Sequence, residues 1–175
     1  MKIDFGKVGI ISAYFAENTE GLYVTKLLKL FYYLDFISYK TRGASVSNDV
    51  YFKFPYGPVP SAIKNSIDLL SKENILGEEF KSQLSPYIKL QKNADGNGNL
   101  IVGAGKEYNL RKLSNSEIEL VKCIAETFKD TRAKQLSNKT HEEAPWLSTS
   151  DFSVIDYELS LELEVESILP AYKSK

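Results

Sequence analysis

The stretch from Tyr23 to Arg42 limits the possible folds more than any other part of this sequence, because it is apolar or aromatic on nearly every side. Its apolar and aromatic positions are Leu27, Leu28, Leu30, Phe31, Tyr32, Tyr33, Leu34, Phe36, Ile37 and Tyr39. A helix with almost no polar stripe has to be covered by other elements on several sides. We therefore expect a compact helical domain built around one central buried helix.

Four shorter segments also have helical periodicity. They are residues 7–16, 61–71, 114–128 and 131–137. Ser114 and Glu117 form the pattern of a capping box, which marks the start of a helix. The sequence therefore predicts a mainly α protein in which amphipathic helices cover the central one.

The β content is expected to be small. Residues 87–91 and 99–103 flank an Asn- and Gly-rich loop, which is typical of a hairpin. Residues 50–54 alternate like a short extended piece, and the three prolines of Pro55–Pro60 predict a rigid turn. The fold class expected is mainly α with a small β-hairpin.

Residues 156–166 are ambiguous. Their apolar side chains alternate as in a strand, whereas their Glu and Leu content favours a helix. We expect a helix, with a strand as the alternative.

Length and charge restrict the function. The chain has 175 residues with no linker-like stretch, so we expect a single domain over 1–175. With 22 basic and 23 acidic residues the net charge is −1, which argues against binding nucleic acid by bulk charge. The charge is uneven, because residues 142–172 hold eight acidic residues and no Lys or Arg. This acidic run is either a solvated face or a surface for a basic partner.

No metal or cofactor site is expected. His141 and Cys123 are the single histidine and the single cysteine, and they do not have the spacing of metal ligands. Gly103–Lys106 lacks the first glycine and the final Ser or Thr of a phosphate loop. No signal peptide and no apolar run long enough for a bilayer span is present, so we expect a cytoplasmic protein without a membrane partner. Nothing positive points to an enzyme.

Three ordered motifs resemble one bacterial and phage family. Lys26–Ile37 resembles its signature helix, Phe54–Pro60 is similar to its Tyr-Gly-Pro turn, and Leu136–Trp146 resembles its closing Leu-Ser-x-x-Thr-His-x-x-x-x-Trp element. This is the SocA-like antitoxin family, also called the Panacea domain, and the resemblance covers about residues 25–147. It implies a mainly helical domain that acts as the antitoxin of a toxin–antitoxin or phage-defence module. It also implies a cognate protein toxin as partner and, from the founding type, delivery of that toxin to an ATP-dependent protease.

The resemblance and the residues together suggest a binding surface. We expect the toxin to be bound by a proline-stiffened aromatic turn and the closing element, although the same side chains suit a core equally well. The candidates are Tyr51, Phe54, Tyr56, Gly57, Pro58, His141 and Trp146.

Asp35 lies in the apolar helix, where a buried carboxylate needs partners. We expect a structural polar contact, made by His141, a Tyr hydroxyl or a backbone amide.

Two other classes of function remain open. One is an enzyme acting on nucleotide or nucleic acid through Asp35, His141 and the tyrosines. The other is a DNA-binding regulator that uses the hairpin of residues 87–103 as a wing. The sequence does not decide the oligomeric state or which toxin is bound. It also does not decide whether the toxin is only sequestered or is delivered to a protease.

Overall fold

A computed structural model describes residues 2–70, 78–92 and 98–173. The helices are α1 (Phe5–Asn18), α2 (Val24–Arg42), α3 (Ser61–Leu70), α4 (Glu78–Leu84), α5 (Asn115–Thr127), α6 (Ala133–Thr140), α7 (Ala144–Leu147) and α8 (Val165–Ile168), and the 3-10 helices are η1 (Leu110–Lys112) and η2 (Tyr157–Glu162). The strands are β1 (Tyr51–Phe54), β2 (Gly57–Pro60), β3 (Ile88–Lys92) and β4 (Asn99–Gly103). The protein is mainly α, as the sequence predicted.

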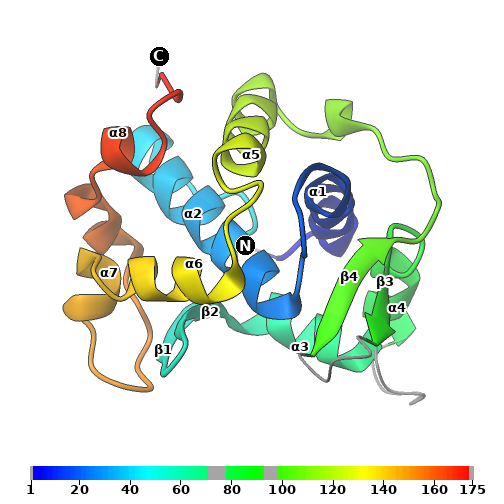
Figure 1. Cartoon of the computed structure of the whole chain (residues 1–175), viewed down its shortest axis with the longest axis horizontal. Coiled ribbons are helices and arrows are strands. Elements are labelled where there is room, and N and C mark those ends of the chain that lie inside the picture. The colour runs from blue at the N-terminus through cyan, green and yellow to red at the C-terminus, as the bar shows by residue number, and fades with distance from the viewer. Residues whose placement is uncertain (1, 71–77, 93–97, 174–175) are drawn as a thin grey trace.

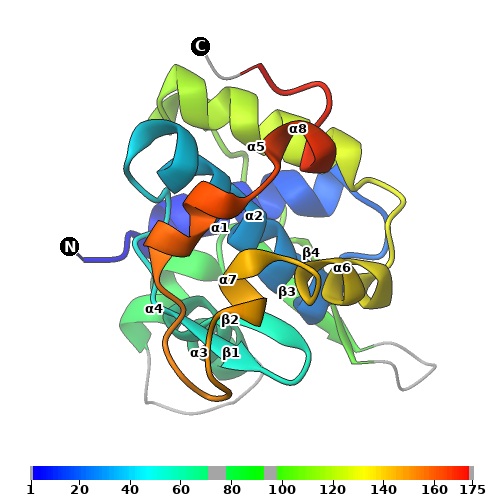
Figure 2. The same cartoon turned by 90° about the vertical axis from the view of Figure 1, so that its left-hand side faces the viewer.

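Helix α2 is the centre of the molecule, with other elements around it in both views (Figures 1 and 2). Every residue from Lys26 to Ser38 is buried. The helix ends at Gly43, whose φ of 71° is the left-handed conformation that glycine adopts without steric cost. The expectation of one central buried helix is therefore confirmed. Within the described residues, no helix is both long enough and apolar enough to span a membrane.

The covering helices begin and end close to where periodicity placed them. Helix α5 starts with the predicted capping box, in which Ser114 and Glu117 exchange hydrogen bonds between side chains and backbone amides. Helix α6 continues three residues beyond the predicted end, to Thr140. Helix α4 was not predicted, because its sequence offers no long apolar repeat.

The β structure is larger than predicted, since there are two antiparallel hairpins. The predicted one is formed by β3 and β4, and residues 93–97 of its loop lie outside the described part of the chain. The second pairs β1 with β2, so Gly57–Pro60 is a strand where the sequence predicted a turn. Prolines at alternate positions of β2 remove only the amides that point away from β1, which is why the strand tolerates them.

The C-terminal segment, residues 148–173, runs back along the outside of β1 and α2 (Figure 2). We expected a helix over residues 156–166, and the structure has the 3-10 helix η2 followed by the short α-helix α8. The alternative, a strand, does not occur in this range. Lys40 holds this segment on α2 by donating hydrogen bonds to the carbonyls of Leu161 and Leu163.

Candidate functional site

The three sequence motifs meet at the β1–β2 hairpin. Lys29 of α2 donates a hydrogen bond from Nζ to the carbonyl oxygen of Pro58, at 2.7 Å. Ser137 of α6 donates from its hydroxyl to the carbonyl of Tyr56. The helix motif and the closing motif therefore both bind the backbone of the Tyr-Gly-Pro turn, which fixes the turn from two sides.

Gly57 is required at this junction for two reasons. Its φ of 100° is one that side-chain-bearing residues rarely adopt. A Cβ atom there would also lie 2.6 Å from Oγ1 of Thr140 and 2.8 Å from Cε of Lys29. The closeness of α2 and α6 to the turn thus depends on the missing side chain.

Lys29 is an unusual residue for such a position, because only 1% of its surface is exposed. Burial lowers the pKa of its ammonium group to about 7. Among the described residues no carboxylate forms an ion pair with it. Its amine therefore acts as a hydrogen-bond donor that ties α2 to β2.

His141 and Trp146 lie against each other. Their rings stack with centroids 4.2 Å apart, and Nζ of Lys53 lies 3.9 Å from the centroid of the Trp146 ring. Nε2 of His141 is buried and has no hydrogen-bond partner in the structure. Burial, with the nearby charges of Lys29 and Lys53, lowers the pKa of His141, so the neutral imidazole is favoured. Trp146 thereby connects this pair to β1, through Lys53 and through a hydrogen bond from Nε1 to the carbonyl of Phe54.

The sequence did not indicate a role for Glu143, although this residue lies between His141 and Trp146 in the sequence. Its carboxylate accepts hydrogen bonds from the hydroxyls of Tyr32 and Tyr33, each at 2.9 Å. Burial nevertheless raises the pKa of Glu143 to about 7. The only signal in the sequence was two adjacent tyrosines in a buried helix, whose hydroxyls need partners.

Asp35 is fully buried and its oxygens are fully used. Oδ1 accepts from the backbone amides of Val46 and Ser47, and Oδ2 accepts from the hydroxyls of Ser47 and Tyr51. Burial raises the pKa of Asp35, and these hydrogen bonds oppose that effect. The polar contact that the sequence predicted is therefore made by a Tyr hydroxyl and backbone amides, together with Ser47, and not by His141.

This arrangement corrects one member of the predicted binding surface. Tyr51 has no exposed surface, because its ring packs on Tyr32, Phe36 and Tyr157 and its hydroxyl binds Asp35. It cannot meet a partner in this structure. Gly57 and Pro58 are buried as well, so they shape the turn and do not present side chains.

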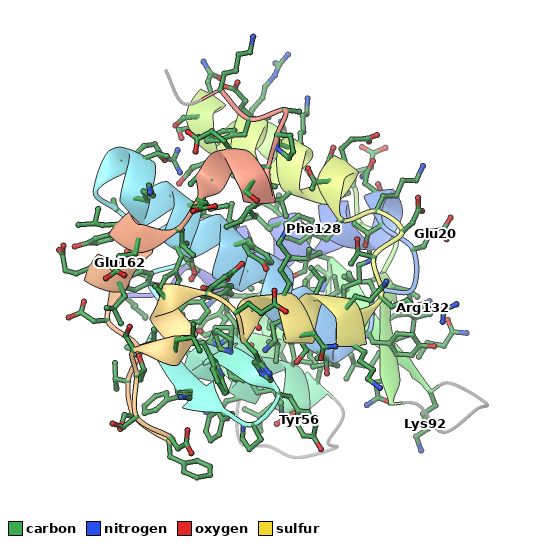
Figure 3. All side chains as sticks on the ribbon, turned by 60° about the vertical axis from the view of Figure 1, so that its left-hand side comes forward. Glu20, Tyr56, Lys92, Phe128, Arg132 and Glu162 are labelled. Carbon is green, nitrogen blue, oxygen red and sulfur yellow. The ribbon has the colours of Figure 1, made fainter. Side chains whose placement is uncertain are left out.

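Phe54 and Tyr56 are exposed. Tyr56 has 77% of its surface exposed and projects from the hairpin tip (Figure 3), and Phe54 is 38% exposed. Both line a groove of about 560 Å³ that also has Phe52, Val59 and Leu28 in its walls. The groove lies between α2, α3 and the hairpin, and its lining is largely apolar.

The residues at the hairpin tip offer aromatic and apolar surface. Among the described residues no three His, Cys, Asp or Glu side chains gather as metal ligands would. Cys123 is half-buried in α5, and burial raises the pKa of its thiol, which disfavours the nucleophilic thiolate. Exposed aromatic side chains beside an apolar groove recur at the centres of protein interfaces.

A comparison with protein families confirms the resemblance that the sequence indicated. The family model described as "Antitoxin SocA-like, Panacea domain" matches residues 27–147. The match begins within the first turn of α2 and includes the rest of that helix, both hairpins, α5, α6 and α7. It ends where the C-terminal segment begins. A search of curated proteins and a search of solved structures each returned no match.

Proposed function

Since this chain belongs to the SocA-like antitoxin family, which is defined by the Panacea domain, we propose that it binds and neutralises a cognate protein toxin in the cytoplasm. The toxin and this chain would form one toxin–antitoxin or phage-defence module. A toxin partner in general follows from the family; the binding surface and the mode of neutralisation are what we propose here.

The exposed aromatic tip of the β1–β2 hairpin carries this proposal. Phe54 and Tyr56 offer large amphipathic rings, and the tip between them is held by Lys29 and Ser137 through its carbonyls. A tip that is already fixed loses little conformational entropy when a partner binds. Aromatic anchors next to an apolar groove are typical of the centres of protein interfaces.

We propose that neutralisation is non-enzymatic. The groups that an enzyme would use are committed to the fold: Asp35 accepts four hydrogen bonds in the core, and the Nε2 atom of His141 is buried beside Trp146. Neither group faces the groove at the hairpin. Covering the toxin's active surface is the simplest way for such a surface to act.

Co-expression tests the proposal. Each small protein encoded next to this chain is expressed with and without it. We expect one of these proteins to inhibit growth and the wild-type chain to restore it. Tyr56→Ala and Phe54→Ala should lose rescue while keeping the wild-type melting temperature. Leu161→Ala removes a side chain of η2 whose exposure, 56%, lies between those of Phe54 and Tyr56; it is the matched control and should rescue growth. Failure of wild type against every neighbour would contradict the proposal.

Sequestration and proteolytic delivery predict different fates for the toxin. If the chain delivers the toxin to an ATP-dependent protease, the half-life of the toxin shortens when the chain is present. If the chain only covers the toxin, the half-life is unchanged and growth is still restored.

A further inference from the structure

The C-terminal segment extends the β1–β2 hairpin although it lies beyond the family match. The amide of Phe152 donates to the carbonyl of Lys53 at 2.9 Å, and the amide of Lys53 donates to the carbonyl of Ser153 at 3.0 Å. The amide of Ile155 donates to the carbonyl of Tyr51 at 2.8 Å. Residues 152–155 thus run along β1 in the loop beside the hairpin (Figure 2), and a single β-bridge joins Val154 to Phe52.

The pairing of this loop with β1 is irregular at Phe152, in the manner of a β-bulge. Phe152 and Ser153 are both opposite Lys53, and the amide of Ser153 closes a turn by donating to the carbonyl of Ser150. The φ of Phe152 is 60°, in the left-handed region that glycine normally fills at the first position of such a bulge. Among the described residues, Asn48 is the other non-glycine residue with positive φ, and asparagine tolerates that conformation well.

The unfavourable backbone conformation of Phe152 is not offset by burial of its ring. The residue is 66% exposed, and its ring makes one edge-to-face contact with Phe54, at a centroid distance of 5.9 Å. A phenylalanine that is strained and solvent-exposed adds little to the stability of the fold. Strain of this kind is found where function requires the side chain.

Phe152 enlarges the aromatic surface of the hairpin tip. Val154, which is 54% exposed, forms an isolated β-bridge with Phe52, and the ring of Phe54 contacts the rings of both Phe52 and Phe152. We call Phe54, Tyr56, Phe152 and Val154 the aromatic face. Two of its four members come from residues within the family match and two from the segment that follows it.

The charges around the aromatic face indicate the chemistry of its partner. No Lys or Arg occurs between Glu142 and Tyr172. Asp151 lines one small pocket together with Phe54 and Phe152, and its side chain is 77% exposed whereas its ion-pair partner Lys53 is nearly buried. Asp156, which follows Val154 by two residues, is exposed as well, and we call Asp151 and Asp156 the acidic border. Glu142, Glu162 and Glu164 line a different groove, together with Lys139. Glu162 points outward from the C-terminal segment (Figure 3). An apolar surface with an acidic border complements a basic protein surface and repels an anionic membrane.

We propose that residues 150–154 complete the toxin-binding surface and set its selectivity. The occupant we assign to the aromatic face is an apolar protrusion of the toxin, surrounded on the toxin by Lys and Arg. This inference rests on the proposed function and adds to it. The family domain supplies the anchored hairpin tip, and the segment outside the family match supplies Phe152, Val154 and the acidic border.

The test uses Phe152→Gly in the full chain. Glycine relieves the backbone strain at φ 60° and removes the ring. We expect the melting temperature to stay within about 3 °C of wild type, because strain relief offsets the greater freedom of glycine in the unfolded chain. Affinity for the purified toxin that wild type neutralises should fall about 10- to 100-fold, as for the loss of an aromatic anchor. Phe152→Tyr should restore most of the affinity.

Asn48→Gly is the control, because it relieves the same φ away from the aromatic face and should bind like wild type. If Phe152→Gly binds like wild type while Tyr56→Ala does not, the inference is overturned and the proposed function stands. If no neighbouring protein binds wild type, both are overturned. If the aromatic face proves to join two copies of this chain, with Phe152→Gly converting a dimer to monomers that still bind the toxin, the inference is likewise overturned.

Discussion

The hydroxyl of Thr140 lies 2.6 Å from the position that a Cβ atom on Gly57 would occupy. The two residues belong to different sequence motifs, 83 positions apart in the chain. Because Lys29 lies at the same junction, one glycine allows the central helix, the hairpin and the closing helix to meet. The turn and its exposed tip therefore depend on contacts between segments that are distant in the sequence.

Gly57→Ala should destabilise the protein by about 2–4 kcal/mol, since the new Cβ is both strained at positive φ and too close to Thr140. Urea unfolding measures this change. Gly105→Ala is the control, because Gly105 has a φ of 93° with no atom within 4 Å of its hypothetical Cβ. Gly105→Ala should lower the free energy of unfolding by about 1 kcal/mol, because only the strain of the positive φ applies there. Equal costs at the two glycines would contradict the close approach at Thr140.

Asp35→Asn should lower the free energy of unfolding by about 3 kcal/mol or more, because an amide group can accept hydrogen bonds through one oxygen only. Its NH₂ group would face either the amides of Val46 and Ser47 or the hydroxyls of Ser47 and Tyr51, all of which donate to the carboxylate in wild type. Asp68→Asn, at a half-exposed position of α3, is the comparison and should cost under about 1 kcal/mol. Thermal unfolding of both variants provides the measurement.

Glu143→Gln should stabilise the protein increasingly as pH rises. The folded-state pKa of Glu143 is raised from 4.5 to about 7, so its favourable contribution is complete below about pH 4.5 and is lost as pH rises through 7. Glutamine stays neutral throughout. The stability difference between variant and wild type should therefore be small at pH 4.5 and on the order of 3 kcal/mol at pH 8. A difference that does not change with pH would mean that Glu143 titrates normally.

Lys29→Met should show the opposite trend. The folded-state pKa of Lys29 is lowered from 10.5 to about 7, so holding the charged amine in the fold costs most below pH 7. The cost declines as pH rises from 7 toward 10.5. Methionine fills similar space without a charge, and we expect its gain in stability to be larger at pH 6 than at pH 9.5. A loss of stability at both pH values would show that the hydrogen bond to Pro58 outweighs the burial cost.

Reversing two charges of the acidic run in residues 142–172 should slow toxin binding. Glu162→Lys with Glu164→Lys is expected to lower the association rate about tenfold at low salt and to weaken its salt dependence, because electrostatic steering acts mainly on association. Glu119→Lys with Glu126→Lys on α5 makes the same change in net charge at exposed positions away from the aromatic face. Stopped-flow kinetics compares the pairs. If both pairs slow association equally, net charge alone is responsible, and the position of the acidic run has no specific effect.

Local and periodic features of the fold were predictable. The apolar run of α2 indicated a buried central helix, and the capping box at Ser114 marked the start of α5. The Asn- and Gly-rich loop predicted the hairpin of β3 and β4. Each of these depends on neighbouring residues, so the amino-acid pattern contains the information.

The candidate site was predictable in part. Phe54 and Tyr56 are exposed at the hairpin tip, whereas Tyr51, only three residues before Phe54, is a core residue bound to Asp35. Tyrosine and phenylalanine suit cores and interfaces equally well, so their identity could not separate the two. The alternation of side chains across β1 separated them, and that strand appears only when β2 is paired with it.

The sequence by itself determined the helical class, the central helix and the family, because each is encoded in the order and spacing of residues. Tertiary structure decided which aromatic rings face solvent, that Glu143 lies between Tyr32 and Tyr33, and that Phe152 lies beside Phe54. These relationships join segments that are about 100 residues apart. Burial and contact across such separations depend on how the elements pack, and packing is a property of the folded chain that no local pattern records.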